Sequence, residues 1–428
     1  MPVVANSFNI KEQIVEIDNL QSFQWNKVLQ SILDKNKSEN QYLIKLNLVK
    51  TTKEKLYFNT VFVEGLKSFI NESFKYNHEL QSTNCDPQLT CLIIPTGIGA
   101  AFGGYAGDAN PLAKVFANKS KYLLTHPNVV NGAVLSDPPS NLIYLEGFFL
   151  DQFLLGQISI VPKNKNKIGV IFDSSISRER LDCEVNVLNA LNAFYGCEIV
   201  GWTLTEKPLK VIPEINKFGF STGKVENIES LVTKGLILKE AGATALAVCC
   251  VIPDLELNSN YTSGSGIDPI GGIESLISRI VSASTGLVSA HAPILVSNEN
   301  VDYNKLSPLS AAEYIAQTFL PSVISGLRFA PQIMLKASSD SLSVKNVSDI
   351  IVPYSAFGSP GVFYMNEVFK NVTLIKENET CLEVNPAHLN INFKVIDKYL
   401  DLINSKELEK SSINPLVLNR PVNKIPRI

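Results

Sequence analysis

The sequence predicts an α/β fold with largely parallel sheets in Rossmann-like βαβ lobes, and a small α+β appendage at the N-terminus. From residue 89 onward, short apolar runs alternate with helical stretches, the order expected when crossover helices join parallel strands. Several runs, such as Ile-Gly-Val-Ile-Phe at 168–172, are apolar throughout, as in strands buried on both faces of a sheet. Of the 428 residues, 45% are hydrophobic and 18% charged, which is enough apolar material for a large core and excludes a disordered chain.

The pattern divides the chain into four segments. The first contains a single glycine, Gly65, and predicts a β-hairpin over 42–49 and 55–63 together with a helix over 20–33. The four predicted segments are an N-terminal α+β accessory domain (1–85), a first α/β lobe with a glycine-rich loop (89–210), a second α/β lobe (211–395), and a C-terminal helix with an extended, proline-containing tail (396–428).

The alternation from residue 89 onward predicts individual strands and helices. The expected strands are 92–95, 122–125, 142–145, 168–172, 198–203, 243–248, 288–290, 349–352 and 372–375. The expected helices are 111–118, 148–155, 178–195, 228–241, 273–284 and 311–324.

Charge and cysteine content exclude several classes of protein. The net charge is −3 and no basic stripe is present, so nucleic acid is not an expected partner. No apolar run is long enough to span a membrane. The seven cysteines form no Cys-x-x-Cys pair, which argues against a disulfide framework or structural zinc site, and the N-terminus lacks the features of a secretory signal. We therefore expect a cytoplasmic protein; a homo-oligomer is compatible with the sequence.

Candidate catalytic residues follow the predicted strands, because ligands of parallel α/β sheets bind at the carboxyl ends of the strands. His126 and His291 each follow a strand and precede a proline within two residues, and imidazole suits acid/base work near neutral pH. Glu146, Asp173 and Glu274 are the accompanying carboxylates. The alternative for each histidine is a buried ring that is hydrogen-bonded to loop carbonyls. A metal is not expected, because no local histidine pair fixes two ligands on one element.

Two glycine-rich stretches indicate where an anion could bind. The first begins with Thr96 and Gly97 and leads into a helix capped by Asn110 and Pro111, but its spacing fits neither the dinucleotide fingerprint nor the P-loop. The second opens an apolar helix near Gly271. The alternative for the first stretch is a tight turn. The predicted substrate- or anion-binding residues are Thr96, Gly97, Gly99, Gly103, Gly104, Asp108, Asn128, Asp268, Gly271, Gly272, Ser355, Glu377 and Asn378.

Seven blocks of sequence, found in order, carry a resemblance to a known family. They are PTGIGAAFGGYAGDANP, LTHPNVVNGAVL, IYLEGFFLDQF, GIDPIGGIESLISRIV, AHAP, SAAEYIAQTFLPSVISGL and IKENET. Over residues 89–400 the chain resembles an uncharacterised family from cyanobacteria and other bacteria, known as a domain of unknown function. This resemblance implies no reaction, substrate or catalytic residue, so the function must be argued from the residues themselves.

The residues support three hypotheses about function. The leading one is an enzyme that acts on a small anionic metabolite, phosphorylated or not, at the carboxyl edge of the sheet. The alternative is a non-catalytic small-molecule binding or sensor protein that uses the same cleft. The third is an assembly or interaction protein with residues 1–85 as its docking module. The sequence identifies no cofactor, and it does not decide between catalysis and binding.

Overall fold

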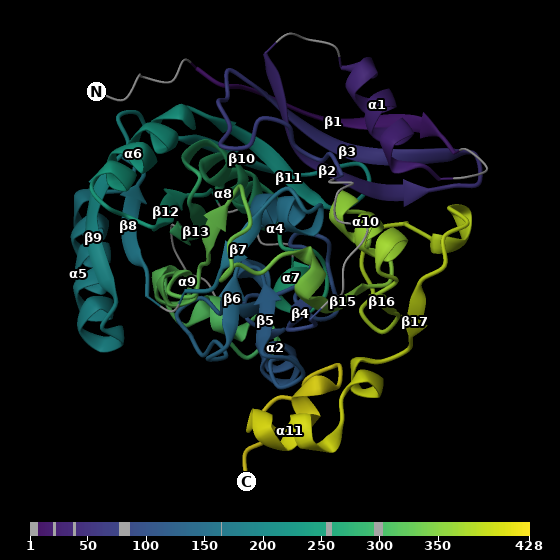
Figure 1. Ribbon diagram of the computed structural model, residues 1–428. Coiled ribbons are helices and arrows are strands. Elements are labelled where there is room, and N and C mark those ends of the chain that lie inside the picture. The colour runs from purple at the N-terminus through teal and green to yellow at the C-terminus, as the bar shows by residue number, and fades with distance from the viewer. Residues whose placement is uncertain are drawn as a thin grey trace.

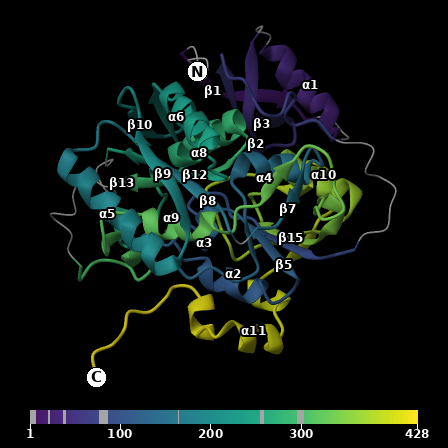
Figure 2. The ribbon, with the colours of Figure 1, turned by 60° about the vertical axis from the view of Figure 1, so that its left-hand side comes forward.

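The computed structural model describes residues 7–19, 23–36, 40–76, 86–163, 165–253, 259–294 and 303–428. It contains a six-stranded and a four-stranded parallel sheet and a three-stranded antiparallel sheet at the N-terminus. The predicted α/β class, with its N-terminal α+β appendage, is confirmed. The N-terminal sheet lies at one end of the molecule and the C-terminal helix α11 (Ser405–Ser411) at the opposite end (Figures 1 and 2).

The N-terminal sheet has the strand order β1-β3-β2. Its strands are β1 (Asn9–Asp18), β2 (Gln41–Thr51) and β3 (Lys55–Glu64), so the predicted hairpin of β2 and β3 is confirmed. Helix α1 (Trp25–Lys35) lies on the outer side of this sheet in Figure 1, and the rest of the molecule lies below it. No residue of β3 is exposed, because both faces of the strand are covered.

The six-stranded sheet has the order β17-β16-β15-β4-β5-β6, and each neighbouring pair is parallel. Its strands are β4 (Leu89–Leu92), β5 (Tyr122–Thr125), β6 (Leu142–Tyr144), β15 (Val347–Pro353), β16 (Val372–Ile375) and β17 (Lys394–Ile396). The accompanying helices are α2 (Asn110–Phe116), α3 (Pro127–Val130), α4 (Gly147–Leu154) and α10 (Pro360–Val368).

The four-stranded parallel sheet has the order β13-β12-β8-β9. Its strands are β8 (Lys167–Phe172), β9 (Glu198–Leu204), β12 (Ala245–Val251) and β13 (Val288–Ile294). Its helices are α5 (Arg178–Tyr195), α6 (Glu229–Glu240), α7 (Ser259–Thr262), α8 (Gly271–Thr285) and α9 (Leu320–Leu327). The central helix is α8, which packs on β13 and also contacts α4, α6 and strands β2 and β11.

Short elements complete the fold. Two antiparallel pairs are β7 (Ser159–Val161) with β14 (Gln332–Met334), and β10 (Lys210–Ile215) with β11 (Ser221–Glu226). The 3₁₀ segments within the described ranges are Ala311–Tyr314, Val344–Asn346, Pro386–His388, Tyr399–Leu402 and Pro415–Leu418. Among the described residues, no helix is both long enough and apolar enough to cross a membrane.

Three details of the structure differ from the sequence predictions. The boundary predicted at 210/211 does not separate the two parallel sheets. Along the chain, all four strands of the four-stranded sheet come after β6 and before β15, which both belong to the six-stranded sheet. A hydrophobic pattern gives the order of strands along the chain but not which strands are neighbours. The helix predicted over 311–324 is instead a 3₁₀ turn followed by α9, because Pro321 sits at the start of a new helix. The predicted C-terminal helix is α11, but the tail after it, predicted as extended, also contains the 3₁₀ turn Pro415–Leu418.

Candidate functional site

A cavity of about 230 Å³ lies where the carboxyl ends of strands from both parallel sheets meet helix α8 and the N-terminal sheet. Both candidate histidines, His126 and His291, line it. The other predicted residues in its wall are Thr96, Asn128, Glu146, Asp268, Gly271, Gly272 and Glu274. The structure thus brings together residues from five separate stretches of the sequence, although their chemical roles stay predictions.

Helix α8 presents a polar face to this cavity. Glu274, Ser275, Ser278 and Arg279 all line the wall, because positions i, i+1, i+4 and i+5 share one side of a helix. The Glu274 Oε1 and His291 Nδ1 atoms are 2.9 Å apart, and the side chains are 22% and 1% exposed, respectively. Burial raises the pKa of Glu274 to about 8 and lowers the pKa of His291 to about 3. Glu274 is therefore the member of the pair that can meet a ligand.

The position of His291 differs from the prediction. Strand β13 continues to Ile294, so His291 lies inside the strand, paired with Val248 of β12, and not in a loop after it. Pro293 is tolerated because β13 is an edge strand of its sheet. An in-strand side chain points to one face of the sheet, which here is the face covered by α8.

His126 directly follows β5, as predicted, and its ring is fixed by a backbone donor. Its Nε2 accepts a hydrogen bond of 3.0 Å from the backbone N–H of Ile94. The neutral ring therefore carries its proton on Nδ1, which has no hydrogen-bond partner among the described residues. Burial, with a smaller contribution from Arg279, lowers the pKa of His126 to about 3. His126 is thus a neutral hydrogen-bond donor in the cavity wall, and its Nε2 lone pair is already engaged.

Arg279 is a cation buried in the wall, 7% exposed. Its Nη1 donates to Asp151 Oδ2 at 2.9 Å and to the backbone oxygen of Ile44 at 3.3 Å. The guanidinium lies against Gly147, where a Cβ would come within 2.6 Å of Nη2. Glu146 caps helix α4 by accepting from the N–H groups of Phe148 and Phe149 at 2.7 and 2.9 Å. Burial raises the pKa of Glu146 to about 7 against the opposing effect of Arg279.

Two further carboxyl groups in the wall are held by the protein itself. Asp268 accepts from the N–H groups of Ile270 and Gly271, at 2.9 and 3.1 Å, just before and at the start of α8. Glu313 accepts from the Tyr261 hydroxyl at 2.7 Å and from the Ala106 N–H at 2.9 Å. Burial is the main cause that raises the pKa of Asp268 to about 7 and of Glu313 to about 8.

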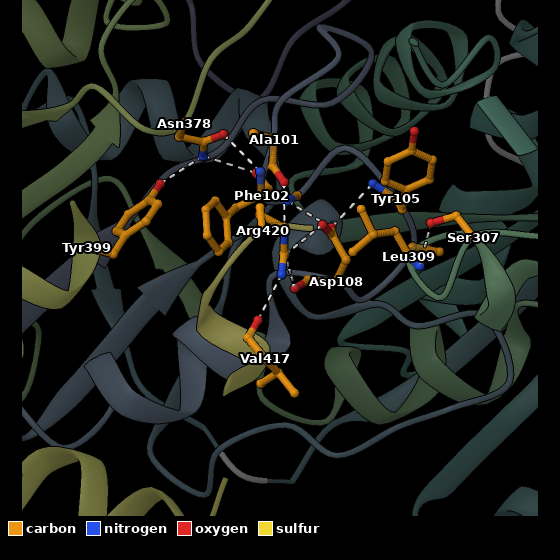
Figure 3. A network of polar contacts seen from close by, with 12 residues as sticks. Ala101, Phe102, Tyr105, Asp108, Ser307, Leu309, Asn378, Tyr399, Val417 and Arg420 are labelled. Atoms are coloured by element: carbon orange, nitrogen blue, oxygen red, sulfur yellow. Dashed lines mark hydrogen bonds and ion pairs between the residues drawn. The ribbon is translucent and has the colours of Figure 1, made fainter. Parts of the chain in front are cut away.

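Several N–H groups of the glycine-rich loop are hydrogen-bonded to other side chains of the protein. Asp108 Oδ1 accepts from the N–H groups of Gly103 and Tyr105 at 2.8 and 3.3 Å, and Asn378 accepts from Phe102 at 2.9 Å (Figure 3). Arg420 of the C-terminal tail pairs with Asp108 at 3.0 Å. Asp108, itself one of the predicted anion-binding residues, thus accepts from two N–H groups of the loop.

The remaining predicted residues also serve structural contacts outside the described cavity wall. Asp173 is fully buried and accepts from Ser175 Oγ at 2.7 Å and the Leu209 N–H at 3.0 Å. Ser355 and Thr380 share a hydrogen bond of 2.7 Å, and Glu377 accepts from the Tyr399 N–H. Gly97, at a φ of +71°, lies against Ser221, where a Cβ would come within 2.2 Å of the Ser221 hydroxyl. Neither Gly99 nor Gly104 contributes to the cavity wall within the described ranges.

Comparison with known proteins places the chain in a family. A family described as a protein of unknown function, DUF3326, matches residues 89–419. This chain belongs to the DUF3326 family. An uncharacterized lipoprotein of the cyanobacterium Synechococcus sp. is 34% identical over 334 residues, which are 77% of this chain and 92% of that protein. No solved structure matches. The family resemblance predicted from the sequence is confirmed.

The cavity of this DUF3326 protein also contains residues that the sequence did not indicate. Arg279 and Asp151 each lie within an apolar helical stretch, and a lone charge on a buried helix face is the signal that could have revealed them. Lys45, Asn47 and Asn59 come from the N-terminal sheet, before the part that matches DUF3326. In the described part of the chain, no group of three or more His, Cys, Asp or Glu side chains is arranged to hold a metal ion.

Proposed function

We propose that this protein is an enzyme that binds a small anionic metabolite in the cavity and transfers a proton with Glu274. The observation that carries this proposal is the contact of 2.9 Å between Glu274 and His291 in the wall that also contains His126 and Arg279. A carboxyl group whose pKa lies close to neutrality suits proton transfer, because it both gives and accepts a proton near physiological pH.

Each residue has a distinct role in this proposal. Arg279 attracts the anionic group of the metabolite, since it is a buried cation with one close carboxylate partner, Asp151. His126 donates Nδ1–H to an oxygen on which negative charge develops, and it is neutral at physiological pH. Below about pH 8, the Glu274 carboxyl group is protonated and donates a hydrogen bond to His291 Nδ1. Above that pH the carboxyl group is ionised and accepts a hydrogen bond from His291 Nδ1–H. His291 is a positioning residue, because its ring is 1% exposed.

Turnover of an unidentified substrate can be tested with a metabolite extract of the native host. The extract is incubated in D₂O with the wild-type protein and with Glu274→Gln, and mass spectrometry follows compounds that disappear, form or gain deuterium. We expect at least one compound to change with the wild-type protein and to change at least about 100-fold more slowly with Glu274→Gln, given the usual contribution of acid/base catalysis. Glu240→Gln, an exposed glutamate on α6, is the matched control.

The same experiment separates catalysis from binding. If compounds bind to the wild-type protein but none is converted, the non-catalytic binding protein is the better account. If a compound is converted equally by the wild-type protein and by Glu274→Gln, then the proposed role of Glu274 is wrong.

We propose the cytoplasm as the location of the protein. The six cysteines that the structure describes are unpaired, which fits a reducing compartment. The Synechococcus relative is named a lipoprotein, so a membrane-attached location is the alternative to test. Fractionation of native cells, with detection of the protein in the soluble and membrane fractions, distinguishes the two locations.

A further inference from the structure

The N-terminal sheet forms one wall of the cavity. Lys45, Asn47 and Val49 of β2 line it at alternate positions, as side chains on one face of a strand do. Asn59 of β3 lies directly opposite Asn47 and also lines the cavity. Because residues 1–88 precede the part that matches DUF3326, this wall is an addition to the family's common region.

Asn59 offers an acceptor that no described residue uses. Its Nδ2 donates to Glu12 Oε1 at 2.8 Å, and this contact orients the amide. The Oδ1 atom is buried and has no hydrogen-bond partner among the described residues, and the whole residue is 1% exposed. An unpaired buried acceptor is costly, so a ligand hydroxyl that donates to Oδ1 would be favoured.

Lys45 is a second cation in the same cavity wall as Arg279. The Lys45 Nζ atom lies 3.6 Å from the carboxylate oxygen Oε1 of Glu12, and the Lys45 side chain is 14% exposed. Arg279 donates to the backbone oxygen of Ile44, the residue next to Lys45, and both cations line the cavity, one from α8 and one from β2. Burial lowers the pKa of Lys45, with a smaller contribution from Arg279. An anion between these cations would offset both effects.

We propose that Lys45 and Asn59, with Arg279, form a subsite for a phosphate monoester of a small polyol. The phosphoryl group lies between the two cations, and a neighbouring hydroxyl of the ligand donates to Asn59 Oδ1. Two cations favour a dianion over a single carboxylate, and the free acceptor beside them favours a hydroxyl. This subsite rests on the proposed function, because it identifies the class of anionic metabolite that the cavity accepts.

Isothermal titration calorimetry on the full chain tests the subsite with four probes. These are sn-glycerol 3-phosphate, propyl phosphate, inorganic phosphate and succinate. Propyl phosphate keeps the ester but lacks both hydroxyls, so its comparison with glycerol 3-phosphate tests the Asn59 contact in the wild-type protein alone. We expect glycerol 3-phosphate to bind about 3- to 10-fold more tightly than propyl phosphate, as one additional neutral hydrogen bond provides.

The variant Lys45→Met removes the charge and keeps the apolar stem. We expect it to weaken binding of all three phosphates about 10- to 100-fold, since a hydrogen bond to a charged group is lost. Lys50→Met is the matched control, because Lys50 lies on the same strand, pairs with Glu383 and does not contribute to the described cavity wall. Its affinities should equal those of the wild-type protein.

Several outcomes would overturn the subsite. Equal phosphate affinities for Lys45→Met and the wild-type protein would remove Lys45 from it, and equal affinities for glycerol 3-phosphate and propyl phosphate would remove Asn59. Succinate binding without phosphate binding would show that the cavity prefers carboxylates. In each of these cases the proposed function would still stand if the turnover experiment shows a conversion that depends on Glu274. If none of the four anions binds, the anion site of the proposed function fails as well.

Discussion

His126 accepts the backbone N–H of Ile94 at Nε2, over 3.0 Å, and this contact determines which proton the ring carries. The edge of the six-stranded sheet thereby engages the lone pair that a general base or a metal ligand would need. The ring faces the cavity as a donor at Nδ1, so His126 suits stabilisation of a negative oxygen better than removal of a proton.

Nuclear magnetic resonance of the imidazole nitrogens tests this state. We expect His126 to be the neutral Nδ1–H tautomer at pH 7 and to remain neutral down to about pH 4, because burial lowers its pKa to about 3. The ring of His388, which is half-buried and contacts Thr51, serves as an internal comparison. A His126 ring that becomes protonated near pH 6 would contradict the assignment.

The raised pKa of Glu274 predicts how stability depends on pH. Its ordinary value of 4.5 rises to about 8 in the folded protein, so the folded state holds this proton more tightly than the unfolded chain. The resulting stabilisation is complete below pH 4.5 and is lost as the pH rises through 8. Glu274→Gln has no such proton. When the pH rises from 5 to 8.5, the free energy of unfolding of Glu274→Gln should therefore fall by roughly 1–3 kcal/mol less than that of the wild-type protein.

Urea unfolding at the two pH values measures this difference. Glu240→Gln, an exposed substitution, should follow the wild-type protein at both. Parallel pH curves for Glu274→Gln and the wild-type protein would show that the folded state does not perturb Glu274.

The contact of Gly147 with Arg279 predicts an effect on anion binding. Gly147→Ala would place a Cβ 2.6 Å from Nη2 and 3.0 Å from Cζ of Arg279, so the guanidinium must move. We expect inorganic phosphate to bind about tenfold more weakly, equivalent to about 1.4 kcal/mol. Gly201→Ala is the matched control, because a Cβ there meets no atom within 4 Å. Unchanged phosphate affinity in folded Gly147→Ala would exclude Arg279 from the anion site.

Arg420 predicts a structural role for the C-terminal tail. Its guanidinium lies 4.0 Å from the centre of the Phe102 ring and donates to Ala101 O at 3.0 Å and to Asp108 (Figure 3). Arg420→Ala leaves Asp108 buried without its cation and should cost about 2–4 kcal/mol of stability. Hydrogen exchange should rise over 101–108, whereas the exposed substitution Arg427→Ala should leave it unchanged. Equal exchange in both variants would mean that the tail does not hold the loop.

The sequence predicted the strands and helices better than the contacts between them. Strand 122–125 and helix 178–195 have the predicted bounds, since apolar runs and helical periodicity are local signals. The roles of the glycine-rich loop depend on Asn378 and Arg420, which are hundreds of residues away, and no local pattern shows such contacts. The polar residues read after strands gave Thr96, His126, Asn128, Glu146 and His291 of the cavity wall, because parallel strands end at the same edge of a sheet. The second glycine-rich stretch gave the other four, Asp268, Gly271, Gly272 and Glu274.

The wall from the N-terminal sheet could not be predicted for the same reason. Lys45 alternates with apolar residues as in any half-buried strand, and Asn59 lies in a strand that is covered on both faces. Only the packing of the N-terminal sheet on α8 brings both residues to the cavity. Their neighbours in the sequence give no indication of a ligand.

The most direct test of the account is a crystal structure of the protein purified from its native host with any ligand that it retains. We predict density in the cavity between α8 and the N-terminal sheet, with an anionic group beside Arg279 and an oxygen within hydrogen-bond distance of His126 Nδ1. A retained small molecule bound elsewhere, such as at the glycine-rich loop with Arg420 displaced, would contradict the account.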